Sequence, residues 1–312
     1  MIRKLLISIG AIIALLVAAM LVVMFFPQLL PSSVPNPWAQ LSVNPLRGGA
    51  YWVQGGVSNT GFIIGDKGVI VIDAQFFTVT AQHELQQIAK LTPLPVNAVI
   101  LTHSDPDHVN SLPEFPRATA IFAHENTRSD MQVALSDPQI RWISRPSPEM
   151  KNYLPTQLVR DRQELDMDGV HLVLLHFAPA HTDGDVIVYL PALQLVYAGD
   201  LLTPAVGPFP GIHAEKHGNS AGWIESVRGM LALDADLFVA GHGDLQTREQ
   251  VQVRLRAADQ RRTTIQSMVE AHKSLAEVKA AFNDPPVTGI ASRFPTFTET
   301  TFDEFSGTHE PH

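Results

Sequence analysis

The chain of 312 residues lacks cysteine. It therefore forms no disulfide and offers no thiolate to a metal ion, so any metal site is built from histidine, carboxylates, backbone groups or water. Positive charge is also scarce, because 22 lysine and arginine residues stand against 31 aspartate and glutamate residues and the formal net charge is −9. Nucleic-acid binding needs clustered positive charge, so we expect no nucleic-acid partner.

Charged residues are absent from Leu5 to Phe26, an apolar run of about 22 residues that is long enough to cross a bilayer as a helix. Two basic residues precede the run, and the next one is Arg47. This asymmetry predicts a cytoplasmic N-terminus and an exported remainder. We expect residues 1–30 to be an uncleaved transmembrane signal anchor, with a cleaved signal peptide as the alternative.

Proline is concentrated in the segment that follows, with four prolines between residues 27 and 37. Because proline fixes φ and lacks a backbone donor, residues 31–46 are expected to form a stiff linker. A globular domain is then expected over residues 47–283. Residues 284–312, which again contain prolines, are expected to be an irregular tail.

Apolar runs and turn signals predict many short strands alternating with helices. The segments Gly61–Ile64 and Val69–Ile72 flank the turn signal at residues 65–68 and are typical of a hairpin. Further strands are expected at 50–53, 96–100, 118–123, 157–159, 164–167, 170–177, 186–190, 195–198 and 236–240. Helices are expected at 80–91, 124–134, 221–233, 247–272 and 275–282.

Four metal-capable residues follow the apolar run at 96–100, namely His103, Asp105, Asp107 and His108. Carboxylates this close together repel one another, and a divalent cation relieves the repulsion while each imidazole contributes a lone pair. A polar loop at the end of a strand is the alternative for any one of these residues. Together they predict a metal or catalytic site.

Three other metal-capable residues, His181, Asp200 and His242, also lie at or just after predicted strand ends. If these strands share one sandwich, their ends meet along one rim and the side chains line a single cleft. Asp73 ends a strand near the same rim and is either a hydrogen-bond acceptor for a ligand histidine or a turn residue. His213 lies in the loop at residues 207–220, where it either contacts substrate or is a solvated surface residue.

The ordered set from His103 to His242 resembles the metallo-β-lactamase-fold superfamily over roughly residues 47–243. That family carries His-x-His-x-Asp-His, then a histidine, a bridging aspartate and a final histidine. The resemblance implies an α/β fold, an αββα sandwich of two mixed sheets flanked by helices. It also implies a bacterial protein, here anchored in the inner membrane with a periplasmic catalytic domain, or released to the periplasm after cleavage.

The resemblance implies two divalent metal ions. The first would be held by His103, His181 and Asp105, and the second by Asp107, His108 and His242, with Asp200 bridging them. Asp105 stands where the family has histidine. Zinc is expected, and because Asp105 is a harder ligand than imidazole, iron or manganese is an alternative.

The implied activity is hydrolysis of a small-molecule ester, lactone, thioester or amide by a hydroxide held between the metals, with Asp107 moving a proton. A β-lactamase proper and a non-catalytic binding protein with a degenerate metal site are the alternatives. The expected partners are a small-molecule substrate and the inner membrane, through the N-terminal helix.

Overall fold

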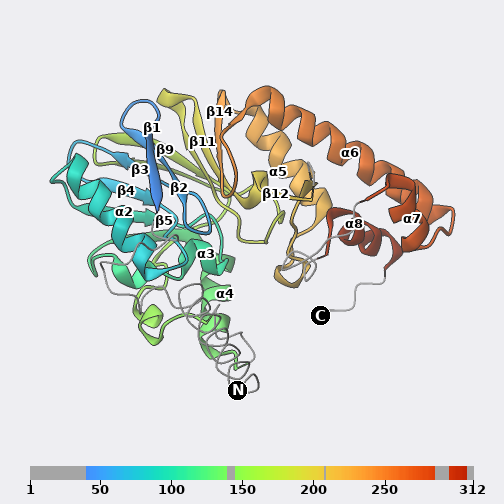
Figure 1. Ribbon diagram of the computed structural model, residues 1–312, viewed down its shortest axis with the longest axis horizontal. Coiled ribbons are helices and arrows are strands. Elements are labelled where there is room, and N and C mark those ends of the chain that lie inside the picture. The colour runs from blue at the N-terminus through green and yellow to red at the C-terminus, as the bar shows by residue number, and fades with distance from the viewer. Residues whose placement is uncertain (1–39, 139–144, 207–208, 285–294, 308–312) are drawn as a thin grey trace, which may run out of the picture.

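The computed structural model describes residues 40–138, 145–206, 209–284 and 295–307 (Figure 1). The predicted anchor at residues 1–30 lies outside these ranges. No helix among the described residues is long and apolar enough to cross a membrane.

The described chain forms two mixed sheets with helices packed on their outer faces, as predicted (Figure 1). The first sheet contains, in order, β1 (Leu41–Pro45), β2 (Ala50–Gly55), β3 (Thr60–Ile64), β4 (Val69–Ile72), β5 (Val96–Ile100), β6 (Ala120–His124) and β7 (Gln157–Val159). Its pairings are antiparallel from β1 to β4 and parallel from β4 to β7.

The second sheet contains, in order, β15 (Gln246–Thr247), β14 (Leu237–Ala240), β11 (Leu195–Gly199), β10 (Ile187–Leu190), β9 (Val170–Leu175) and β8 (Arg162–Met167). Only the β11–β14 pairing in this sheet is parallel within the described residues. The strands β12 (Pro204–Val206) and β13 (Phe209–Pro210) form a separate two-stranded ribbon.

The helices divide between the two sheets. Those beside the first sheet are α2 (Thr78–Leu91), α3 (Pro106–Val109) and α4 (Glu125–Ser136). Those beside the second are α5 (Ser220–Ala232), α6 (Arg248–Glu270), α7 (Leu275–Phe282) and α8 (Phe297–Ser306). Figure 1 shows the first group and the second group on opposite sides of the sheets.

Alternating side chains explain how each sheet is covered on both faces. Along β9, Leu172 and Leu174 belong to the apolar cluster between the sheets, whereas Val173 and Leu175 pack with α5. All four are at most 4% exposed. A continuous apolar run is typical of a strand buried on both faces, and such burial fixes the register of the strand in its sheet.

Two segment boundaries differ from the prediction. Residues 41–45, expected in the linker, form β1 and pair with β2 in antiparallel register. Residues 297–306, expected to be irregular, form α8. Thr296 and Glu299 close a capping box at its start, and the buried Phe297 packs against Trp223 with ring centroids 6.3 Å apart. Pro295, which lies just before the N-cap, therefore does not prevent the helix.

Candidate metal centre

The seven predicted metal-capable residues meet at one rim of the sandwich. Their ligand atoms form two groups, each with all atoms within 4.8 Å of one another: His103, Asp105, His181 and Asp200 in the first, and Asp107, His108 and His242 in the second. This geometry is compatible with the prediction that these residues are metal ligands.

Strand ends deliver these side chains. His103 follows β5, and α3 starts at Pro106 and carries Asp107 and His108 on one short helical turn. Asp200 opens a 3-10 helix directly after β11, and His242 follows β14. The stretch expected as a loop thus contains a helical turn, which proline at its first position favours.

Asp105 lies at the centre of the first group. Its Oδ2 is 3.2 Å from His181 Nε2 and 3.5 Å from His103 Nε2. His181 Nε2 is also 3.7 Å from Asp200 Oδ2. The two imidazoles and two carboxylates therefore point at a common volume, despite the shorter side chain at position 105.

Asp200 connects the two groups. Its Oδ1 is 3.4 Å from His108 Nε2, and its Oδ2 is 3.5 Å from His242 Nε2. In the second group, Asp107 Oδ2 lies 3.1 Å from His242 Nε2 and 3.6 Å from His108 Nε2. A carboxylate that faces histidines of both groups is placed where a bridging ligand of two ions is needed.

Hydrogen bonds orient three of the imidazoles. His108 Nδ1 lies 2.8 Å from Asp73 Oδ2, His103 Nδ1 lies 3.0 Å from Thr102 Oγ1, and His181 Nδ1 lies 3.0 Å from the Gly211 carbonyl. Each ring therefore presents Nε2 to the centre. Of the two readings of Asp73, the hydrogen-bond acceptor is the one the structure shows, and a carboxylate behind a histidine is the usual support of a metal ligand.

Two glycines allow the rim to close. Gly199 has φ 51° and ψ −143°, a conformation that favours glycine, and it turns β11 into Asp200. A Cβ on Gly241 would lie 1.9 Å from Asp200 Oδ1. Any larger residue at position 241 would therefore displace the carboxylate that joins the two groups.

The centre attracts positive charge. Burial opposes charge on the His181 imidazole, but Asp105 and Asp200 outweigh it and raise its pKa to about 9. Burial likewise opposes charge on His242, and Asp200 and Asp107 raise its pKa to about 10. Without metal, protons therefore occupy the cluster, and a divalent ion must displace them.

Two buried imidazole nitrogens indicate whether these residues suit a metal ion. The Nε2 atoms of His103 and His108 are buried and have no hydrogen-bond partner among the described residues. A buried polar atom without a partner costs free energy, and a metal ion removes that cost by accepting the lone pair. The donor set of imidazoles and carboxylates suits zinc as well as iron or manganese.

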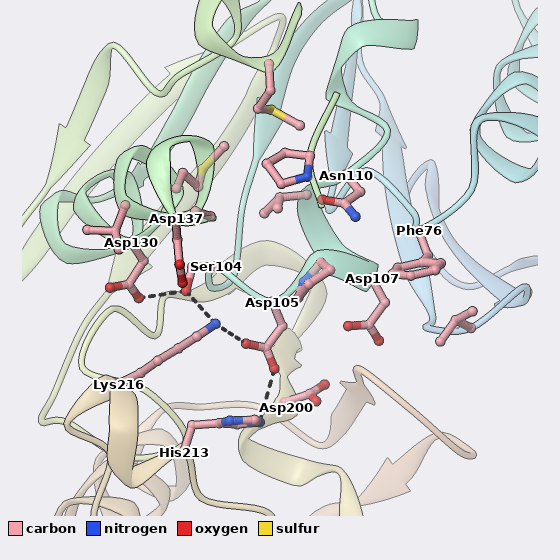
Figure 2. Close-up of a pocket in the computed structure, with 18 of the residues that line it drawn as sticks. Phe76, Ser104, Asp105, Asp107, Asn110, Asp130, Asp137, Asp200, His213 and Lys216 are labelled. Atoms are coloured by element: carbon pink, nitrogen blue, oxygen red, sulfur yellow. Dashed lines mark hydrogen bonds and ion pairs between the residues drawn. The ribbon is translucent and has the colours of Figure 1, made fainter. Parts of the chain in front are cut away.

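A pocket of about 760 Å³ opens above the centre. Its described lining includes four residues of the cluster, the apolar Val57, Phe76 and Met131, and Lys216; the four are Asp105, Asp107, Asp200 and His242. Figure 2 shows the Lys216 ammonium between Ser104 and Asp105, with His213 on the other side of Asp105.

Sequence reasoning did not single out Lys216, and it left His213 undecided between substrate contact and surface. The residues lie on a loop with no strand-end signal, and only the fold shows that both contact Asp105. The ion pair with Lys216, followed by His213 and His103, outweighs burial and holds the pKa of the Asp105 carboxyl well below its usual value.

Similar proteins share this fold. The alpha subunit of 2,4-dinitroanisole O-demethylase from Nocardioides sp. (strain JS1661) is 30% identical over 204 residues, covering 65% of this chain and 57% of that subunit. The structure of a sec-alkylsulfatase from Pseudomonas sp. superposes with a TM-score of 0.65 at 16% identity, covering 86% of this chain and 51% of that one. This chain thus spans a little over half the length of both.

A smaller relative is matched almost completely. The mono-zinc form of the metallo-beta-lactamase FIM-1 from Pseudomonas aeruginosa superposes with a TM-score of 0.57 at 16% identity, covering 74% of this chain and 97% of that one. Residues 53–242, which run from β2 to the last histidine of the rim, match the family's sequence pattern. The chain belongs to the metallo-beta-lactamase superfamily.

Proposed function

We propose that this protein is a metal-dependent hydrolase that cleaves an ester, lactone, thioester or amide bond in a small molecule. One observation carries the proposal. Two groups of imidazoles and carboxylates share Asp200 at the floor of a 760 Å³ pocket, and two buried Nε2 atoms there have no hydrogen-bond partner among the described residues.

Divalent ions bound here would supply Lewis acidity and bring the pKa of water towards neutrality. His103, Asp105 and His181 would hold one ion, and Asp107, His108 and His242 the other, with Asp200 between them. Asp107 lines the pocket, and although burial opposes its ionisation, His108 and His242 lower the pKa of its carboxyl. It is therefore a carboxylate near neutral pH and able to accept a proton there.

Carboxylates are the main charged groups in the lining of the pocket. Lys216 is the only lysine or arginine among the described lining residues, and its ammonium is paired with Asp105. Six of the described lining residues are carboxylates: Asp105, Asp107, Asp130, Asp137, Asp200 and Glu215. Because the proposed ions would neutralise Asp105, Asp107 and Asp200, the pocket charge does not decide between neutral and anionic substrates, and both kinds belong in the test.

We also propose that the catalytic domain is periplasmic and held at the inner membrane, with cleavage and release as the alternative. The apolar run from Leu5 to Phe26 and the basic residues before it support this. A reporter that folds only after export, fused after residue 46, tests it. Activity of the reporter in the membrane fraction supports the anchor, activity in the soluble periplasm supports cleavage, and no activity contradicts export.

Metal analysis with a substrate panel tests the hydrolase proposal. The purified protein is expected to hold close to two transition-metal ions per chain. The Asp107→Ala variant should lose one ion and turnover, whereas His171→Ala, which removes an exposed imidazole, should keep both.

The panel contains neutral esters, lactones, thioesters, amides, an alkyl sulfate and nitrocefin. Turnover of neutral esters or amides above the sulfate supports the proposal. Turnover of nitrocefin alone makes the protein a β-lactamase. A wild-type protein that binds no transition metal after reconstitution contradicts the hydrolase proposal and favours a degenerate binding protein.

A further inference from the structure

Imidazoles approach Asp105 from three sides. Its Oδ2 lies 3.2 Å from His181 Nε2, 3.3 Å from His213 Nε2 and 3.5 Å from His103 Nε2. The ring of His213 meets that of His181 edge to face, with centroids 4.7 Å apart. A third imidazole therefore contacts Asp105 beside the first group, although it lies outside the four residues whose ligand atoms are all within 4.8 Å of one another, and it comes from outside the family's motif.

His213 is oriented in the same way as the predicted ligands. Its Nδ1 lies 2.5 Å from Glu215 Oε1, which leaves Nε2 directed at Asp105. Asp73 supports His108 in the same manner, through Nδ1. A carboxylate behind Nδ1 fixes the tautomer and raises the basicity of Nε2, and this pairing is typical of metal-binding histidines.

The backbone holds His213 in place beside His181. The His213 amide donates to the His181 carbonyl at 2.8 Å, and the amides of Lys216 and Gly218 donate to the His213 carbonyl at 2.9 and 3.0 Å. A Cβ on Gly218 would lie 2.3 Å from the His181 carbonyl oxygen, so the loop packs as closely as glycine permits. The His213 side chain is 16% exposed, which suits a ligand at the edge of a pocket.

Charge and ligand number agree with this placement. The family has three histidines and the bridging aspartate around the first ion, and here position 105 is aspartate. His213 restores the third imidazole, and the Lys216 ammonium pairs with Asp105 Oδ1 and offsets the added negative charge. The formal charge around the ion is then the same as in the family's usual arrangement.

We propose that His213 Nε2 is a ligand of the metal ion on the Asp105 side, in place of the imidazole that the family carries at position 105, and that Lys216 neutralises Asp105. This inference rests on the proposed metal-dependent function. It assigns to the loop before α5 a part of the metal site that the family motif does not mark.

Zinc affinity of the metal-stripped full-length protein tests the proposal, measured for both ions by competition with a chromophoric chelator. We expect His213→Ala to weaken one binding event by about 100-fold or more, since even residues behind ligands are worth 10–100-fold. The matched control is His217→Asn, which removes an exposed imidazole from the same loop at φ 58°, a conformation asparagine tolerates. It should bind both ions with wild-type affinity.

A second set of variants separates loss of a metal ligand from a general loss of folding. In Asp105→His/Lys216→Met the usual third imidazole is restored, so adding His213→Ala should weaken zinc binding by less than about tenfold, a coupling that identifies the shared site. The visible spectrum of the Co²⁺-loaded wild type should change on His213→Ala and not on His217→Asn.

Unchanged zinc affinity and Co²⁺ spectrum in His213→Ala, with only KM altered, would overturn the inference and make His213 a substrate contact while leaving the hydrolase proposal intact. Equal losses in the wild-type and Asp105→His/Lys216→Met backgrounds would also overturn it. A wild-type protein that binds no zinc at all would overturn both proposals.

Discussion

The two groups of candidate ligands, one around Asp107 and one around Asp105, have similar geometry but are built from different parts of the chain. On one side, Asp107, His108 and His242 follow strand ends and match the family's motif residue for residue. On the other, Asp105 departs from the motif, and the residues that contact it, His213 and Lys216, come from a loop. The sequence motif identifies every residue of the group around Asp107. The residues that contact Asp105 from the loop can be identified only from the folded structure.

The largest expected effect is on the motif side. Asp107→Asn should lower kcat by about 10²–10⁴-fold, because the amide neither carries the charge nor accepts the proton that we propose Asp107 accepts. Steady-state kinetics on the best substrate of the panel measure the loss. Retained turnover in Asp107→Asn, with two ions still bound, would remove Asp107 from the chemistry.

Gly241→Ala should affect both sides at once, because the new Cβ would displace Asp200 Oδ1, from which it would lie 1.9 Å. We expect metal affinity and activity to fall by about 100-fold, as for loss of a residue that orients ligands. Gly307→Ala is the control, since a Cβ on Gly307 meets no atom within 4 Å. Equal loss of activity in both variants would show that displacement of Asp200 is not the cause.

The carboxylates behind the histidines allow a direct comparison of the two sides. Asp73, which is 2% exposed, supports His108, and Glu215, whose side chain is 44% exposed, supports His213. Asp73→Asn should weaken the ion on its side by about 10–100-fold, and Glu215→Gln should weaken the other by less than about tenfold. Competition titrations with zinc measure both, and a larger loss in Glu215→Gln would reverse the proposed order.

The smallest effect on the site is expected from Glu84→Gln, which acts on stability. Glu84 is fully buried, and burial, opposed by hydrogen bonds from Thr60 and Gln75, raises the pKa of its carboxyl to about 7. Because the folded protein holds this proton more tightly than the unfolded chain, the free energy of unfolding falls as pH rises from about 4.5 to 7 and stays lower above.

Glu84→Gln should remove that fall, which amounts to about 3 kcal/mol. Urea unfolding of both proteins at pH 5 and pH 8 measures it, with zinc affinity as the control that should not change. An identical pH dependence in the two proteins would show that Glu84 ionises normally.

Sequence alone was enough to predict the sandwich and the rim. Apolar runs fix which strands are buried, and each of His103, Asp200 and His242 directly follows such a run, so their convergence follows from the strand ends. The capped helix α8 was missed because the prolines before it are typical of irregular chain, whereas burial of Phe297 against Trp223 stabilises it.

Other contacts depend on the fold itself. Asp73 was predicted either to accept a hydrogen bond from a ligand histidine or to be a turn residue, and only the fold shows that its partner is His108. Nothing local in the sequence indicates that the loop carrying His213 folds back onto His181. Such contacts join segments that are far apart in the chain. In the sequence, each of these residues is a single polar residue and cannot be told from a polar residue on the surface. Position 105 was the one departure from the family motif among the predicted ligands, and from the sequence it bore on the identity of the metal.

Anomalous diffraction from crystals of the zinc-loaded protein tests the central claim most directly. We predict two peaks in the anomalous difference map, one among His103, Asp105, His181 and His213 and one among Asp107, His108 and His242, with Asp200 between them. A single peak on the Asp107 side would contradict the two-ion account, and a map with no peak at the rim would contradict the metal centre altogether.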